Sequence, residues 1–223
     1  MIDKINPRFL LTFTVLQIDG FVLVGGKSSR MGTNKFALRF GGATFAERAA
    51  AALRKIAPER VSFVGGANQK SERLPLDIPC IADIFSDKAA LGGICTALAH
   101  SDSEWAVILA CDYPFVTENL FVRLAEITSR VDAEISAVAP VQADGRLQPL
   151  CAFYRVKDCL AAGELLLESD EVLPARRIIE NVAARLVYFE ELADLDGAEN
   201  FFINVNTPEE FLRAQNIFRR QNL

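Results

Sequence analysis

Residues 105–111 read WAVILAC, an uninterrupted run of apolar side chains near the middle of the chain. A run without alternation between polar and apolar residues predicts a strand that is buried on both faces. Strands of this kind occur in parallel sheets that carry helices on both sides. The stretch therefore predicts an α/β protein.

Shorter apolar runs elsewhere in the chain alternate with segments of helical periodicity. We expect strands at residues 21–24, 61–64, 80–82, 105–111, 135–141, 150–154 and 186–189, and helices at residues 44–56, 91–100, 117–127, 160–168, 175–182 and 207–218. This alternation predicts a three-layer α/β/α fold with a mostly parallel sheet, formed by residues 19–223 as a single domain. The pair at 135–141 and 150–154, separated by Gly145, predicts a hairpin or another antiparallel part of a mixed sheet.

Two of the expected helices have well-marked beginnings. Thr44 and Glu47 have the spacing of a capping box, in which each side chain binds a free backbone N–H at the start of the helix. Residues 207–210 read TPEE, which places a threonine before the helix, a proline at its first position and a glutamate at its third.

Composition excludes several classes of protein. The chain has 223 residues, of which 51% are hydrophobic and 24% charged, so it is neither disordered nor fibrous. Its net charge of −5 argues against non-specific binding to nucleic acid or to an anionic membrane. No apolar run reaches the length of a membrane span.

The counts of histidine and cysteine narrow the chemistry further. His100 is the only histidine, which argues against a His-ligated zinc site, a His–Asp–Ser triad and a two-histidine iron site. We expect this ring at a helix end and Trp105 in the core. The five cysteines include no CxxC pair and have mostly apolar neighbours, which predicts buried thiols in a reducing cytosol.

The first 18 residues are expected to form an N-terminal extension, either an extra strand or a disordered segment. Lys4 and Arg8 precede an apolar run there, as in a signal peptide, but no small-residue cleavage site follows. We therefore expect a cytoplasmic protein.

A glycine-rich loop follows the expected strand at 21–24, and residues 23–35 read LVGGKSSRMGTNK. Glycines let the backbone approach a ligand closely, and successive free N–H groups bind anions. Arg30 and Lys35 add positive charge, so the loop is typical of a triphosphate cradle. It has neither the GK[ST] ending of a P-loop nor the GxGxxG of a dinucleotide site. The alternative is a glycine-rich turn with a solvated basic face.

Two aspartates directly follow expected strands. Asp112 follows the apolar run 105–111, and a carboxylate at the carboxyl end of a buried strand can hold Mg²⁺ against nucleotide phosphates. Asp83 follows the strand at 80–82 and can accept hydrogen bonds from a base. The alternatives are a helix-capping or loop-bonded role for Asp112 and an ordinary loop position for Asp83.

Five motifs in this order resemble those of the molybdenum cofactor guanylyltransferases, which belong to a nucleotidyltransferase superfamily that also includes sugar-phosphate nucleotidyltransferases. They are GGKSSRMGxxK at 25–35, LGGI at 91–94, CDYP at 111–114, QPLCAFY at 148–154 and NVNTPEE at 204–210. The first and the last are specific, and together the motifs extend from about residue 20 to residue 215. The resemblance implies a Rossmann-like nucleotidyltransferase fold.

The resemblance also implies a reaction, the transfer of GMP from GTP to the phosphate of molybdopterin with release of pyrophosphate. Mg²⁺ is the implied cofactor, held by Asp112 and Asn206, and the implied catalytic residues are Arg30, Lys35 and Asp112. The nucleotide would be bound by Leu23, Val24, Gly25, Gly26, Lys35, Asp83, Gly93 and Asp112. GTP and molybdopterin are the implied partners, with transient contacts to other cofactor-biosynthesis or molybdoenzyme-maturation proteins. Gly145, Arg146 and Gln148 are candidates for contacts with the acceptor.

The sequence departs from the family pattern at three places. Asn34 stands where an aspartate is usual, Gly65 where an asparagine contacts the base, and Ala89-Ala90 where Gly-Pro is usual. Two alternatives therefore stay open. One is a related transferase that uses CTP or another nucleotide with molybdopterin or a sugar or polyol phosphate. The other is a nucleotide-binding relative without catalysis.

Overall fold

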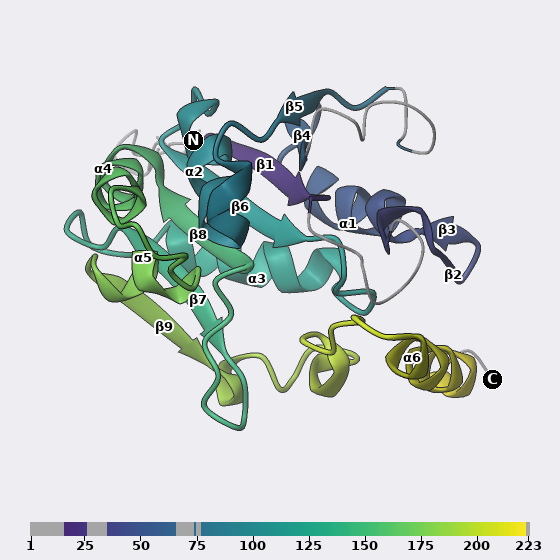
Figure 1. Ribbon diagram of the computed structural model, residues 1–223. Helices are drawn as coiled ribbons and strands as arrows, with labels where there is room; N and C mark the ends of the chain where they lie inside the picture. Colours follow the sequence, from purple (N-terminus) through teal and green to yellow (C-terminus); the bar gives the residue numbers. More distant parts are fainter. Residues whose placement is uncertain (1–15, 26–34, 66–73, 75–76, 222–223) are drawn as a thin grey trace, which may run out of the picture.

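The computed structural model describes residues 16–25, 35–65, 74 and 77–221, and Figure 1 shows their arrangement. Most of the expected N-terminal extension lies outside the described residues. Gly26 and Arg30, which the resemblance places in the phosphate site, lie outside them as well.

The described residues form an alternating series of strands and helices. The strands are β1 (Ile18–Leu23), β2 (Arg39–Phe40), β3 (Ala43–Thr44), β4 (Val61–Gly65), β5 (Cys80–Ala82), β6 (Trp105–Ala110), β7 (Ala137–Val141), β8 (Cys151–Arg155) and β9 (Ala184–Tyr188). The α-helices are α1 (Phe45–Arg54), α2 (Ala89–Ala99), α3 (Glu118–Thr128), α4 (Val156–Leu167), α5 (Arg176–Glu180) and α6 (Pro208–Gln221). Short 3₁₀ helices are η2 (Lys35–Ala37), η4 (Ser86–Lys88), η5 (Phe189–Glu191) and η6 (Ala198–Asn200).

Seven of the strands form one sheet in the order β5-β4-β1-β6-β8-β7-β9 (Figure 1). Neighbouring strands are parallel except around β8, which runs antiparallel to both β6 and β7. The expected mostly parallel, mixed sheet is thus confirmed, including the antiparallel pair on either side of Gly145. This glycine has φ +84°, a backbone conformation that glycine adopts without steric strain.

Side chains along β6 alternate between two hydrophobic clusters, as the pleat of a strand requires. Trp105, Val107 and Leu109 pack with α1 and α3 on one face of the sheet. Ala106 and Ile108 pack with α2, α4 and α5 on the other. Every residue of β6 is buried, so the sequence expectation of a strand covered on both faces is confirmed. The fold is a three-layer α/β/α sandwich.

A third cluster, here named the α6 cluster, attaches α6 to the short β2–β3 hairpin and to the segment that follows Asp112. It consists of Leu38, Phe40, Phe45, Phe115, Ile203, Val205, Phe211, Ala214, Ile217 and Phe218. The Phe40 ring is central, with centroids 4.9 Å from Phe218 and 5.4 Å from Phe115. The Arg48 guanidinium of α1 lies 5.4 Å from the centroids of Phe40 and Phe218, within the range of a cation–π interaction.

Some element boundaries differ from the sequence expectations. β1 begins at Ile18, and α4 begins at Val156, directly after β8 and four residues before the expected start. The β2–β3 hairpin was not expected, because strands of two residues have no detectable periodicity. Of the helices that the structure describes, none is long and apolar enough to cross a membrane.

Both marked helix beginnings are confirmed. Thr44 and Glu47 form the capping box of α1, with the Glu47 N–H donating to Thr44 Oγ1 at 3.1 Å. Thr207 and Glu210 bind each other's backbone N–H groups at the start of α6. Most of the other local expectations hold as well. Trp105 is buried and His100 Nδ1 contacts the Thr96 carbonyl of α2. Four of the cysteines are buried thiols, as expected, whereas Cys80 is only partly buried.

Candidate active site

The carboxyl ends of four parallel strands lie at one edge of the sheet. Leu23 at the end of β1 pairs with Val64 of β4 and with Ala110 of β6, so these strands finish at the same level. Asp83 and Asp112, which follow β5 and β6, therefore come to the same edge as the start of the glycine-rich loop. In open α/β sheets, this is the edge where ligands bind.

A cluster of three polar side chains lies at this edge. The Lys35 Nζ is 3.3 Å from Asp112 Oδ2 and 2.5 Å from Asn206 Oδ1. About one fifth of each side chain of the Lys35–Asp112 ion pair is exposed, 19% and 20%. Asn206 is 171 residues from Lys35 in the chain. Three separate segments are thus joined at one point, and we name these residues the phosphate cluster.

The backbone fixes the position of the phosphate cluster. The Cys111 N–H donates to the Leu23 carbonyl, and the Val205 N–H donates to the Asp112 carbonyl at 3.0 Å. Glu210 of α6 accepts from the Asn206 N–H at 2.6 Å, so the first turn of the helix also holds the asparagine. The cluster is therefore supported by β6 on one side and by α6 on the other.

The electrostatics of Asp112 favour a cation next to it. Burial raises the pKa of this carboxyl, and the neighbouring Lys35 ammonium acts in the opposite direction without cancelling the rise. A buried carboxylate is stabilised by a positive charge in contact with it, which Lys35 provides.

The oxygen atoms at this point suit Mg²⁺. The ion binds hard oxygens, takes one or two carboxylates and completes its shell with water and phosphate. Asp112 and Asn206 provide a carboxylate and an amide oxygen. Among the described residues there is no group of three or more His, Cys, Asp or Glu that could hold a metal by itself. The residues thus fit a metal shared with substrate phosphates rather than a protein cage.

Three of the residues expected to bind the nucleotide meet on the β5 side of the edge. A Cβ atom added to Gly93 would lie 3.3 Å from Leu23 Cδ1 and 3.9 Å from Asp83 Oδ2. Gly92 has a different role, because its added Cβ would be 2.0 Å from the Phe85 carbonyl oxygen. Gly92 therefore permits α2 to pack against the preceding loop, whereas Gly93 faces Leu23 and Asp83.

The other expected contacts divide between the core and the surface. The Val24 side chain is buried in the core and its N–H donates to the Val64 carbonyl, so neither is available to a ligand. Gly25 is exposed at the end of β1. Gly65 accepts a backbone hydrogen bond from the Asp83 N–H at 2.8 Å and so helps to place Asp83.

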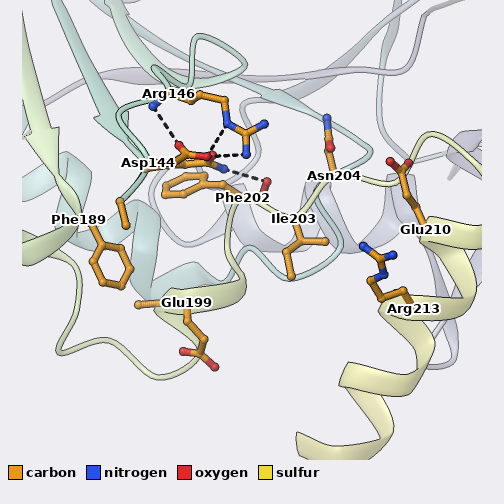
Figure 2. A pocket seen from close by; sticks show the side chains of 12 residues that line it. Asp144, Arg146, Phe189, Glu199, Phe202, Ile203, Asn204, Glu210 and Arg213 are labelled. Carbon is orange, nitrogen blue, oxygen red and sulfur yellow. Dashed lines mark hydrogen bonds and ion pairs between the residues drawn. The ribbon is translucent and has the colours of Figure 1, made fainter.

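A pocket of about 420 Å³ lies between the β7–β8 loop and the beginning of α6. Its lining residues are Gln142, Ala143, Asp144, Arg146, Phe189, Ala198, Glu199, Phe202, Ile203, Asn204, Glu210 and Arg213. Figure 2 shows Asp144 and Arg146 together on one side and Glu210 and Arg213 of α6 on the other. Asn204 lines the pocket two residues before Asn206, so the pocket adjoins the phosphate cluster.

Sequence reasoning found only part of this pocket. Arg146 was a candidate for acceptor contacts, and it forms an ion pair of 2.7 Å with Asp144. Gln148 is buried and accepts a hydrogen bond from the Tyr113 hydroxyl, so it supports the β7–β8 loop from the core side. Glu199, Phe202 and Arg213 were missed because no motif marks them, and Arg213 reaches the pocket only because α6 packs beside it.

The model of the MobA-like NTP transferase domain matches residues 20–186. The chain belongs to this family. It is therefore an enzyme of the nucleotidyltransferase class, and the family and enzyme class expected from the five motifs are confirmed.

Relatives within the family carry a more specific name. The chain is 33% identical over 201 residues to a probable molybdenum cofactor guanylyltransferase of Bacillus anthracis, with 88% of this chain and 94% of the relative covered. A protein of the same name from Carboxydothermus hydrogenoformans is 32% identical over 200 residues, with the same shares covered.

Solved structures share the fold of this chain. The molybdopterin-guanine dinucleotide biosynthesis protein A of Archaeoglobus fulgidus superposes with a TM-score of 0.74 at 25% identity, covering 91% of this chain and 99% of that one. A 2-C-methyl-D-erythritol 4-phosphate cytidylyltransferase of Thermus thermophilus has a TM-score of 0.61 at 15% identity, covering 89% and 98%, and shares the fold.

Proposed function

We propose that this enzyme transfers GMP from GTP to the phosphate of molybdopterin in a Mg²⁺-dependent reaction. The products are the guanine dinucleotide form of the cofactor and pyrophosphate. The observation that carries the proposal is the phosphate cluster, which combines a lysine with two oxygen ligands suited to Mg²⁺ at the ligand-binding edge of the sheet. The named relatives support the choice of base and acceptor.

In the proposed reaction, an oxygen of the molybdopterin phosphate forms a bond to the α-phosphorus of GTP. The bond between the α-phosphorus and the bridging oxygen breaks, and the electron pair leaves with pyrophosphate. The attacking phosphate is already an anion, so no strong general base is needed. This agrees with a chain that contains a single histidine.

Catalysis then rests on positioning and on neutralising negative charge. Asp112 and Asn206 would hold Mg²⁺, which would neutralise charge on the phosphates when bound. Lys35 lies within reach of both residues and would bind phosphate oxygens as a mobile point charge. The resemblance gives Arg30 a similar role.

Guanine would be bound between Leu23, Asp83 and Gly93. The Asp83 carboxylate can accept hydrogen bonds from the ring N–H and the exocyclic amine of guanine. Adenine and cytosine do not offer this pair of donors. Gly93 lies close against Leu23 and next to Asp83, so a side chain at this position would crowd both residues.

Molybdopterin would occupy the pocket between the β7–β8 loop and α6. Its volume is in the range of small-molecule sites. Arg213 and Arg146 can bind the acceptor phosphate, while Asp144 and Glu199 can accept hydrogen bonds from the amino and ring N–H groups of a pterin. We include in the proposal a cytoplasmic location and transient contacts with proteins that supply molybdopterin or receive the product.

The test is a turnover assay with molybdopterin and each of GTP, CTP, UTP and ATP, with and without Mg²⁺. The proposal requires the guanine dinucleotide and pyrophosphate in equal amounts, with GTP preferred and Mg²⁺ required. A preference for CTP would move the assignment to a cytidylyltransferase, an alternative that Gly65 keeps open because it has no side chain to contact guanine. Nucleotide binding without turnover would identify a non-catalytic relative.

A further inference from the structure

Two buried threonines in the helices of this protein use their hydroxyl groups differently. Thr128 in α3 donates to the Leu124 carbonyl four residues earlier at 2.8 Å, the usual partner of a threonine inside a helix. Thr96 in α2 is fully buried and donates instead to Asp83 Oδ1, at 2.8 Å. The Thr96 hydroxyl is therefore directed at a carboxylate in the active site rather than at its own helix.

Thr96 fixes more than one atom of the loop that carries Asp83. Its Oγ1 also accepts a hydrogen bond from the Ile84 N–H at 3.2 Å. The Phe85 N–H provides Asp83 Oδ1 with a second donor at 3.0 Å. One oxygen of the carboxylate is thus bound on two sides, and the loop backbone is held by the same hydroxyl.

The other carboxylate oxygen faces the proposed base site. Asp83 Oδ2 lies 3.9 Å from the position of a Cβ added to Gly93, whereas Oδ1 is the oxygen that Thr96 and Phe85 bind. The terminal torsion of an aspartate has a broad energy minimum, so the carboxylate plane is not fixed by its own preferences. Hydrogen bonds to Oδ1 hold the plane so that Oδ2 remains directed toward Gly93.

We propose that Thr96 is a positioning residue for base selectivity, which fixes the Asp83 carboxylate so that Oδ2 accepts the donor edge of guanine. The inference rests on the proposed function, because it assigns Asp83 to the base. It adds a determinant of selectivity that does not touch the nucleotide. Asp83 is the more important for base selectivity because Gly65, at the end of the neighbouring strand, offers no side chain to the base.

The experiment measures the affinities of the full chain for GTP, ITP and ATP by calorimetry in the presence of Mg²⁺. The variants are Thr96→Val, which removes the hydroxyl at constant shape, and Thr96→Ser, which restores it. Thr128→Val is the matched control, since it also removes a hydroxyl from a buried helical threonine. ITP lacks the exocyclic amine of guanine, and ATP also lacks the ring N–H.

We expect Thr96→Val to lower the preference for GTP over ATP by about tenfold or more, the range for a lost hydrogen bond to a charged group. Thr96→Ser and Thr128→Val should retain the preference of the unmodified protein. A merely structural role for Thr96 would lower all three affinities together and leave their ratios unchanged. In an Asp83→Asn background the Thr96→Val change should have no further effect on the ratios.

The outcomes separate this inference from the function on which it rests. If the unmodified protein prefers GTP and Thr96→Val keeps the full preference, the positioning role is wrong and the proposed function stands. If Thr96→Val alters the ratios equally in the Asp83→Asn background, the effect does not pass through Asp83 and the inference is again wrong. If the unmodified protein shows no preference for GTP, the assignment of the base is wrong, and the inference falls with it.

Discussion

The burial of Asp112 and its proposed role as a metal ligand act against each other. Burial raises its pKa, so the charged form is disfavoured in the folded protein, while the proposed metal site needs this form. A group with a raised pKa in the folded state binds its proton more tightly there than when unfolded. Its contribution to the free energy of unfolding therefore decreases as the pH rises through the window from the unfolded to the folded pKa.

Asp112→Asn should consequently separate activity from stability. We expect turnover to fall about 100-fold or more, the range for loss of a preorganised electrostatic group. The melting temperature at pH 7 should stay equal or rise, because a buried charge is removed and Asn206 still binds Lys35. Turnover and thermal unfolding are measured on the same preparation. Asp77→Asn, in an exposed ion pair with Arg54, is the control for loss of a carboxylate. Full Mg²⁺-dependent turnover in Asp112→Asn would contradict the metal assignment.

Lys35→Met should have the opposite effect on stability. Without the ammonium, Asp112 remains buried with no cation in contact, so the melting temperature at pH 7 should fall. Protonation of Asp112 relieves the penalty, and the deficit should therefore shrink as the pH is lowered toward 5. Thermal unfolding from pH 5 to pH 8 measures this. A deficit that is independent of pH would show that the two side chains are not coupled.

At the scale of residues, sequence patterns predict the candidate site residues but not the side chains that hold them in place. Lys35, Asp112 and Asn206 each stand in a recognisable local motif, so all three were predicted as site residues. Thr96 stands in an apolar helix and contacts Asp83 only because α2 packs beside the end of β5. No local pattern shows that contact, and so it could not be predicted.

At the scale of elements, the α6 cluster holds the site together. Lys35 begins η2, which leads into Leu38 and Phe40; Asp112 precedes Phe115; and Asn206 follows Val205. The same ten apolar residues thus connect the three segments that supply the phosphate cluster. Packing in this cluster should control the distance between Lys35 and Asn206.

Substitutions at two adjacent glycines in the β2–β3 turn test whether the α6 cluster holds the site together. Gly41 has φ +59°, and an added Cβ would lie 2.4 Å from the Phe218 ring, whereas Gly42 has φ +90° with nothing within 4 Å of an added Cβ. Both alanine variants strain the backbone, but only Gly41→Ala also forces the Phe218 ring of α6 to shift. We expect Gly41→Ala to lower the free energy of unfolding by about 1–3 kcal/mol more than Gly42→Ala.

Gly41→Ala should also weaken Mg²⁺-dependent nucleotide binding, because Asn206 moves with the start of α6. Denaturant unfolding and calorimetry measure the two effects. Equal losses in both variants would show that α6 adapts to the extra methyl group without moving the site.

Elements with a long pattern in the sequence were predicted best. Helices with capping residues and long apolar strands were predicted with nearly correct bounds, since each carries its signal within one segment. The β2–β3 hairpin was missed, as was the early start of α4, where β8 continues into the helix without a turn. The α6 cluster was missed because its members come from five separate segments.

At the scale of the whole molecule, the edge of the sheet opposite the active site is anchored by a buried carboxylate. Asp19 near the start of β1 accepts from Arg60 Nε at 2.6 Å, from Ser101 Oγ at 2.7 Å and from two backbone N–H groups. Burial acts to raise the pKa of Asp19, but these hydrogen bonds outweigh it and the net pKa is lowered. The network joins β1 to the loop before β6.

Asp19→Asn should lower the free energy of unfolding by about 1–3 kcal/mol at pH 7, the range for unsatisfied buried partners. The sign of the pH dependence follows from a folded pKa below the usual value of 3.8. The stabilisation is present at neutral pH and is lost as the pH falls from about 4 through the folded pKa. Urea unfolding of both proteins at pH 7 and pH 3 should show the difference shrinking at pH 3.

Nucleotide binding by Asp19→Asn should be unchanged. Asp19 is four residues from Leu23 along β1, or about 13 Å, and so lies at the opposite end of the strand from the phosphate cluster. A loss of GTP affinity in Asp19→Asn, measured at a temperature where the variant is folded, would contradict the separation of the two edges.

The alternation of strands and helices predicted the three-layer sheet of the whole molecule. It could not predict the order β5-β4-β1-β6-β8-β7-β9, since β8 is inserted between β6 and β7 by pairings distant in sequence. The pocket beside the phosphate cluster depends on that order and on α6, and so it was visible only in three dimensions.

Asn206 is 171 positions after Lys35, and this separation affects the order in which the parts of the site are synthesised on the ribosome. At about 5–20 residues per second, Asn206 is made roughly 10–35 s after Lys35. Six of the seven sheet strands, β4 to β9, are made during that interval and β1 is made before it, while the asparagine and the helix that fixes it do not yet exist. All strands of the sheet are therefore made before the phosphate cluster is complete, and the proposed chemistry depends on α6, the last helix that the structure describes.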